Sequence, residues 1–343
     1  KGSYLLNAVG VALVFALLTG LFAANAFGTS TTYIQGICTT ACYTIIMVTS
    51  LNLVVGFMGE FSLGHAGFVS VGAYVSAIVS GALAGKGLSD LGLFLIALLV
   101  GGLAAGIMGV LVGIPALRLR GDYLAIVTLA FGEIIRNVIN CLYISLDGQR
   151  LHIAFNNPNV AGKLLVNGPA GATGVNKMAT FGMGFALTLF TLFVVLNLID
   201  SRSGRAIMAI RDNRIAAEAM GLNVTKYKMM AFVTSAVLAG MAGALYGLNF
   251  STVAASKFKF DTSILVLVFV VLGGIGNIRG SIISATLLTI LPELLRAFAN
   301  YRMLIYAIVL ILVMLATNNP TLRGMVERII PRGKGRKKEA DEA

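Results

Sequence analysis

Charged residues are scarce in this sequence: Asp, Glu, Lys and Arg make up 12% of its 343 residues, against roughly 25% in soluble domains. Hydrophobic residues account for 57%, and the mean hydropathy is +0.90. Several apolar runs reach about 20 residues, which as helix is enough to cross the roughly 30 Å hydrocarbon core of a bilayer. The short segments of alternating polarity that build an outer-membrane barrel are absent. The composition therefore predicts an all-α polytopic membrane protein.

Residues suited to metal binding or nucleophilic chemistry are also few, with two His and three Cys. Cys38, Cys42 and Cys141 lie within or beside apolar runs, with no His or carboxylate near them, and we interpret them as small apolar packing residues. No G-x-x-x-x-G-K-[ST] loop occurs, so the chain is not expected to hydrolyse nucleotide or to hold a cofactor or metal itself. Few carboxylates fall in the apolar runs, which disfavours a proton-coupled pump. We therefore expect that the chain is not an enzyme.

The apolar residues gather into about ten segments, some of which could be re-entrant. They run over 5–27, 37–58, 63–85, 91–115, 123–146, 181–199, 229–250, 262–278, 281–298 and 302–318. The positive-inside rule is satisfied when both termini lie in the cytoplasm. We expect a transmembrane domain over 1–318 and a basic cytoplasmic tail over 319–343. The net charge of +12 lies in loops and in this tail, which fits lipid headgroups and not nucleic acid.

The loop 200–228 is the most polar stretch between apolar segments, with six Lys or Arg against three acidic residues. Asp212 is a predicted helix N-cap, and Gly221 suits the left-handed position after the helix end, so we expect one short helix from 212 to 220. A capped helix between spans suggests a contact surface for another protein. The alternative is a basic cytoplasmic loop that only sets topology.

Two glycine-rich stretches, 55–67 and 271–280, interrupt the apolar pattern with similar glycine spacing. Glycine at this density favours either close helix packing or a broken helix whose backbone lines a transport pathway. A tight cytoplasmic turn is the alternative for the first stretch. The candidate pathway-lining residues are Gly56, Gly59, Ser62, Gly64, His65, Gly67, Gly273, Gly274 and Gly276.

Two further features stand out. Glu133 lies near the middle of a segment, one turn before Arg136, so an i,i+3 pair is expected to offset the cost of a carboxylate in the membrane. The pair could be functional or structural. The external loop 147–180 is long and rich in Gly and Asn, and is either a docking site for an external partner or a disordered connector.

Four stretches together resemble the permease subunit of branched-chain amino acid ABC importers of the Liv type, and more closely its LivM-like subunit. They are GFMGEFSLGHAGFVSVGAY at 56–74, PALRLRGDYLAIVTLAFGE at 115–133, the segment 203–247, and VLGGIGNIRGSIISATLLTILPELL at 271–295. The resemblance implies a bacterial inner-membrane complex with a second permease subunit, two cytoplasmic ATPase subunits that bind ATP and Mg, and an extracytoplasmic substrate-binding protein.

The resemblance also implies that part of the loop 200–228 forms a coupling helix that rests on an ATPase. The residues that match this helix are Arg211, Asp212, Ala216, Ala217, Glu218 and Gly221. Related permeases serve urea or short amides, so these substrates stay open at this point. A stand-alone secondary transporter or channel is the alternative from another class.

Overall fold

The computed structural model describes residues 31–84, 89–119, 121–147, 150–155, 163–295, 301 and 304–311. By internal contacts the chain divides between residues 289 and 290 into two units. The predicted segment 5–27 and the basic tail 319–343 lie outside the described residues. Of segment 302–318, only 304–311 are described, and they are helical.

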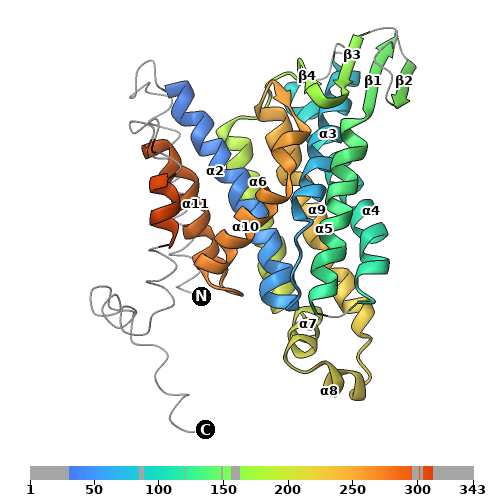
Figure 1. Cartoon of the computed structure of the whole chain (residues 1–343), viewed down its shortest axis with the longest axis vertical. Coiled ribbons are helices and arrows are strands. Elements are labelled where there is room, and N and C mark those ends of the chain that lie inside the picture. The colour runs from blue at the N-terminus through green and yellow to red at the C-terminus, as the bar shows by residue number, and fades with distance from the viewer. Residues whose placement is uncertain are drawn as a thin grey trace. The chain divides into compact units, whose positions relative to one another are not determined.

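Among the described residues, six helices are long and apolar enough to cross a membrane. They are α2 (Thr31–Asn52, continued by the π-helix η2, Leu53–Met58), α3 (His65–Leu83), α4 (Asp90–Ala116), α5 (Asp122–Asn140), α6 (Phe181–Asp200) and α9 (Val224–Asn249). They coincide with the second to seventh predicted segments (Figure 1). Two shorter helices, α10 (Phe260–Gly273) and α11 (Ile278–Leu294), coincide with the next two. The structure thus shows a mostly helical, multi-pass arrangement, while the count of ten spans stays a prediction.

The centre of the first unit is built from α3, α4 and α9, whose backbones approach closely through glycine. A Cβ on Gly72 or Gly243 would meet a backbone carbonyl of the facing helix, and a Cβ on Gly240 would meet the Cβ of Ala105. Contact of this kind is typical of helix packing in membranes, where small residues let helices gain van der Waals contact. Ala73, Ala239, Ala242 and Ala244 are fully buried in the same region.

The expectation of an all-α protein is wrong in one respect, because the described residues include a small antiparallel sheet. Its strands are β1 (Leu142–Asp147), β2 (Arg150–Phe155), β3 (Lys163–Asn167), β4 (Ala172–Thr173) and β5 (Thr252–Val253), in the order β2-β1-β3-β4-β5. β1 and β2 pair antiparallel, from Leu142 with Phe155 to Asp147 with Arg150. The predicted segment 123–146 is therefore helical only to Asn140, and the described part of the loop 147–180 contains the strands β2, β3 and β4.

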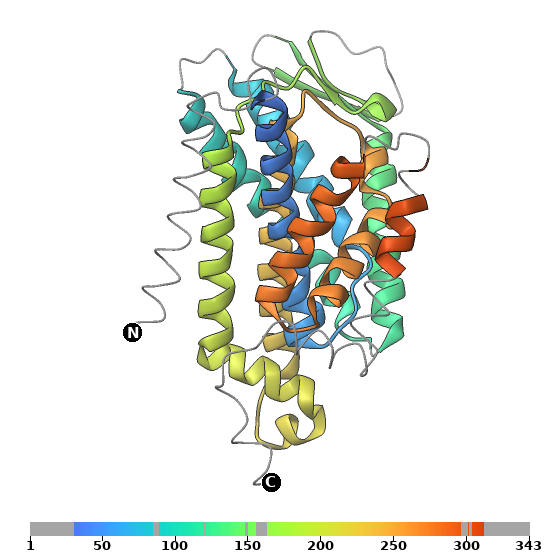
Figure 2. The same ribbon diagram turned by 90° about the vertical axis from the view of Figure 1, so that its left-hand side faces the viewer.

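The sheet lies at one end of the helices, and two short helices, α7 (Arg202–Asp212) and α8 (Arg214–Ala219), lie at the opposite end (Figures 1 and 2). The six long helices run between these two ends. The long helices therefore separate the sheet from the short helices α7 and α8.

Replacing a packing glycine tests this core. We expect Gly243→Val to lower the melting temperature of the detergent-purified protein by several degrees, because its side chain would overlap the Val69 carbonyl and overpacking costs about 1–3 kcal/mol. Gly182→Val is the matched control, since a Cβ there meets nothing within 4 Å. Equal melting temperatures for the two variants would contradict the packing described.

Candidate functional site

The loop 200–228 folds as two helices and not as the single helix expected from 212 to 220. Asp212 is the last residue of α7, and Asn213, in an extended conformation, both ends α7 and caps α8. Its Oδ1 accepts a hydrogen bond from the Ala216 N–H at 3.0 Å. The assignment of Asp212 as N-cap is therefore wrong by one residue, because Asn caps as well as Asp and the chain turns at Asn213.

Gly221 ends α8 as the sequence predicts, with φ of +79°. The Leu222 N–H donates to the Ala217 carbonyl at 3.1 Å, which satisfies one of the free carbonyls at the helix end. Ala217 is buried with Ile210 and Val224, and Leu222 and Tyr227 pack against this cluster. The cluster holds α8 in place against the elements before and after it.

The outer face of α8 carries two large apolar side chains that sequence reasoning missed. Ile215 is 81% exposed and Met220 is 82% exposed. Beside them, Arg214 and Glu218 form an i,i+4 ion pair at 2.9 Å. Among the predicted coupling residues, Ala216, Glu218 and Gly221 are exposed and Ala217 faces inward. Two large apolar residues, Ile215 in α8 and Met220 directly after it, within an otherwise polar loop were the available signal in the sequence.

The first glycine stretch is a broken helix. Gly59, with φ of +76°, ends η2, and α3 begins only at His65. In between, the chain passes the middle of α5, where a Cβ on Gly64 would meet the Thr128 carbonyl. The Leu63 N–H donates to Thr128 Oγ1 at 3.2 Å. Side chains of other helices thus supply partners that a continuous helix would supply from its own backbone.

The remaining predicted residues of this stretch, Gly67, His65 and Ser62, have different surroundings. A Cβ on Gly67 would lie 3.0 Å from the Gly132 Cα, so Gly67 is a close-packing position. His65 is buried and its Nε2 lies 2.9 Å from Ser50 Oγ, which gives this imidazole a hydroxyl partner inside the protein. The buried Ser62 Oγ has no hydrogen-bond partner among the described residues.

The second glycine stretch is also a break, and it lies against the first. α10 ends at Gly273, and Gly274 and Gly276 both have positive φ. Asn52 joins the two breaks: its Oδ1 accepts from the Gly276 N–H at 2.9 Å, and its Nδ2 donates to Ser281 Oγ at 2.9 Å. A Cβ on Gly56 would lie 2.7 Å from the Gly276 Cα, so the two chains touch at their glycines.

Arg211, at the end of α7, ties the two-helix loop to this junction. Its Nη1 donates to the Gly56 carbonyl at 2.9 Å, while its Nε and Nη2 contact Asp212. Its aliphatic stem covers Gly59, where a Cβ would lie 2.5 Å from the Arg211 Cγ. The structure therefore brings together residues that the sequence assigned separately to coupling and to the pathway.

A buried ion pair makes a second tie between the same elements. Lys228, in the first turns of α9, pairs with Glu60 of the first break, and their side chains are only 10% and 12% exposed. The chain thus contacts the first break just before α8, at Arg211, and again after α8, at Lys228. Sequence reasoning missed this pair because its members are 168 residues apart.

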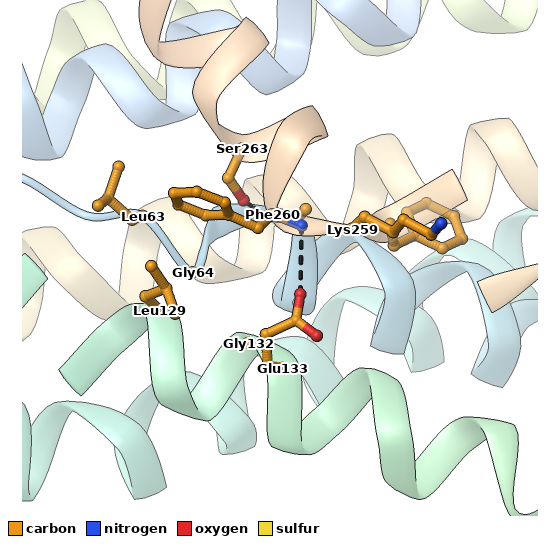
Figure 3. Close-up of a pocket in the computed structure, with 11 residues that line it drawn as sticks. Leu63, Gly64, Leu129, Gly132, Glu133, Lys259, Phe260 and Ser263 are labelled. Carbon is orange, nitrogen blue, oxygen red and sulfur yellow. Dashed lines mark hydrogen bonds between the residues drawn. The ribbon is translucent and has the colours of Figure 1, made fainter. Parts of the chain in front are cut away.

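Glu133 and Arg136 pair on α5 as their spacing predicts, with Arg136 Nε and Nη2 each 2.7 Å from Glu133 Oε2. The other oxygen, Oε1, accepts from the Phe260 N–H at 3.2 Å at the start of α10 (Figure 3). Across the described residues, no group of three or more His, Cys, Asp or Glu could hold a metal ion.

Comparison with known proteins supports the resemblance. The family model described as the branched-chain amino acid transport system / permease component matches residues 33–314. No solved structure matches.

Several curated relatives carry related names. The high-affinity branched-chain amino acid transport system permease protein LivM of Salmonella typhimurium and of Escherichia coli is 34% identical over 79% of this chain, and the match covers 65% of LivM. LivH of Escherichia coli is 28% identical over 86% of this chain and 96% of its own length. The ribose import permease protein RbsC of Haemophilus influenzae is 26% identical over 80% of this chain and 84% of RbsC. The chain belongs to the family of permease components of branched-chain amino acid transport systems.

Proposed function

We propose that this chain is a membrane-spanning permease subunit of an ATP-driven importer for branched-chain amino acids. The observation that carries the proposal is the hydrogen bond from Arg211 to the Gly56 carbonyl, which connects an exposed helix pair to a broken helix inside the membrane domain. The names of the relatives favour branched-chain amino acids over urea or short amides. The family consists of transport components and not of enzymes, so the energy is supplied by other subunits.

The complex that we propose lies in the bacterial inner membrane. It contains this chain, a second permease subunit, two cytoplasmic ATPase subunits that bind ATP and Mg, and an extracytoplasmic binding protein that delivers substrate. The basic α7–α8 region lies on the cytoplasmic side and the sheet lies outside, consistent with the charge of the loop 200–228. The presence of both LivM and LivH among the relatives supports a second, different permease.

The face of α8 is suited to an ATPase groove. Ile215 and Met220 supply exposed apolar anchors, and the Arg214–Glu218 pair supplies a charged border. Interfaces with an apolar centre and a polar rim concentrate binding energy in the few residues at the centre. We propose that Ile215 and Met220 enter the groove, with Ala216, Glu218 and Gly221 at its edge.

Movement of α8 would reach the pathway through Arg211. When the ATPase subunits close, α7 shifts with α8, because Ile210 of α7 and Ala217 of α8 share one buried cluster. Arg211 then displaces the Gly56 carbonyl, and Asn52 carries the displacement to Gly276 in the second break. Breaks are suited to this task because their backbone is not held by a continuous helical hydrogen-bond ladder.

Charge placed at the apolar anchor tests ATPase docking. We expect Ile215→Asp to weaken association with the ATPase subunits about tenfold or more, because loss of a hot-spot anchor costs about 2 kcal/mol or more and each 1.4 kcal/mol is tenfold in affinity. Association is measured by co-purification and by binding-protein-stimulated ATPase activity in proteoliposomes. Met220→Leu, which keeps an apolar side chain, is the control. Wild-type association of Ile215→Asp would refute the docking surface.

Removing the guanidinium of Arg211 tests transmission. We expect Arg211→Met to keep the ATPase subunits bound but to reduce substrate uptake per ATP hydrolysed about tenfold, since a hydrogen bond from a charged group contributes about 1.5–3 kcal/mol. Arg205→Met is the matched control, because Arg205 also donates to a carbonyl, but to that of Asp200 at the end of α6. If both variants transport alike, Arg211 does not transmit the movement. Uptake by the wild-type complex without ATPase subunits would refute the importer itself.

A further inference from the structure

The spanning helix α5 presents an exposed stripe along one face. Its members are Tyr123, Ile126, Ala130, Ile134 and Val138. Because successive members are three or four residues apart, they lie on one side of the helix. Elsewhere α5 packs against α3, α4 and α10. The stripe is therefore a continuous surface and not a set of scattered exposed residues.

The border of this stripe is polar. Glu133 and Arg136 lie beside it with side chains 30% and 21% exposed in the single chain, and Asn137 is exposed. Ionisable residues in spanning segments face a protein interior or an aqueous cavity and avoid lipid. Of the six long helices in the described part of the chain, α5 has the lowest mean hydropathy and, with α6, the smallest buried share. Lipid is therefore a poor neighbour for this side of α5.

The helix α4 shows the composition of a side that suits lipid in the same chain. Between residues 95 and 114, every exposed residue of α4 is Leu, Ile or Val. The exposed residues of α6 between 183 and 196 are likewise apolar. α5 differs from both helices, because its exposed side combines aliphatic residues with an ion pair and an amide.

The bonds of the ion pair leave a donor for a partner. Arg136 binds Glu133 through Nε and Nη2, so the Nη1 end of its guanidinium is not used in this pair. A guanidinium has five N–H donors and no acceptor. A surface that covers this side of α5 therefore complements it with aliphatic side chains along the stripe and with a hydrogen-bond acceptor at the depth of Arg136.

The length of the stripe selects the kind of partner. Tyr123 and Val138 are about 22 Å apart along the helix axis, at 1.5 Å per residue, which is most of the roughly 30 Å hydrocarbon core. α5 runs from the end of the fold that carries α7 and α8 to the end that carries the sheet (Figure 1). A cytoplasmic ATPase or an external binding protein would contact only one of these ends. The partner that covers the whole stripe is a helix of another membrane-spanning chain.

We propose that this stripe is the surface on which the second permease subunit packs, through one of its spanning helices. The partner helix crosses α5 near Ala130, where a small side chain lets two helices approach closely. Its aliphatic residues lie against Ile126 and Ile134, and an acceptor side chain binds Arg136. The partner is a different chain, in keeping with the presence of both LivM and LivH among the relatives. The inference rests on the proposed function, which supplies the second permease subunit.

Photo-cross-linking tests the surface. The benzophenone amino acid p-benzoylphenylalanine replaces Ile134 in the full importer, which is reconstituted in lipid nanodiscs, and the cross-linked peptides are identified by mass spectrometry. We expect position 134 to join this chain to the second permease subunit with a yield about tenfold above that of position 99. Leu99 is the matched control, because Leu99 and Ile134 are both 54% exposed and Leu99 lies on the aliphatic side of α4.

A bulky side chain at the proposed crossing point gives a second measurement. We expect Ala130→Trp to reduce the amount of second permease that co-purifies with this chain about tenfold, because the indole keeps the two helices apart. Ala186→Trp is the matched control, since Ala186 is also an exposed alanine of a spanning helix but lies on the apolar side of α6. Its co-purification is expected to match wild type. Ala130→Ser, which keeps the side chain small, is expected to retain association.

The outcomes separate this inference from the function on which it rests. Equal yields at positions 134 and 99, with ATP-dependent leucine uptake intact, would overturn the surface and leave the importer standing. Cross-links from position 134 to a second copy of this chain, or to residues 1–30 or 290–343 of the same chain, would overturn the proposed occupant. Uptake that does not require the ATPase subunits would overturn the proposed function. If Ala130→Trp fails to fold, the cross-linking at position 134 decides the matter.

Discussion

Backbone groups exposed by a broken helix must find hydrogen-bond partners, and in a membrane domain those partners must come from the protein. This constraint organises the contacts of both glycine stretches. Gly56 lies among the last residues of η2, where carbonyls have no partner within the helix, and the Arg211 guanidinium binds its carbonyl. Asn52 accepts from Gly276, and Glu133 accepts from Phe260 at the start of α10. Each contact satisfies a helix end and at the same time joins two elements that are distant in sequence.

The position of these contacts explains how the need to satisfy backbone groups at a helix break can also serve the proposed transport. A cation at the C-terminal end of a helix is also favoured by the helix dipole, so Arg211 stabilises the end of η2 while extending from α7. A break that obtains its stability from a neighbouring helix has to respond when that neighbour moves. The glycine contact between Gly56 and Gly276 leaves no side chain that could absorb such a movement between the two breaks.

Local features of this chain were readable from its sequence, and contacts between distant segments were not. Gly59, Gly221 and Gly276 adopt positive φ, a conformation that favours glycine, so the residue type itself is a signal for such positions. The Glu133–Arg136 pair follows from helical spacing. The strand Leu142–Asp147 was read as part of a span, because its Leu, Tyr and Ile residues raise the average hydropathy while the period changes from helix to strand. The contacts of Arg211 with Gly56 and of Asn52 with Gly276 join residues 155 and 224 positions apart, and no periodicity within one segment encodes them.

The Glu60–Lys228 pair completes the physical argument for the α7–α8 region. Removing one partner of a buried pair costs about 3–5 kcal/mol, because the other charge is left without compensation, so the pair strongly resists separation of α9 from the first break. Arg211, at the junction of α7 and α8, is bound to the same break. A helix pair attached at only one end could swing without moving the membrane domain. Bound to the break before α8 by Arg211 and after it by Lys228, and packed internally through Ile210, Ala217 and Val224, the region is suited to the proposed transfer of a push on α8 to the segment that contains Gly56 and Glu60.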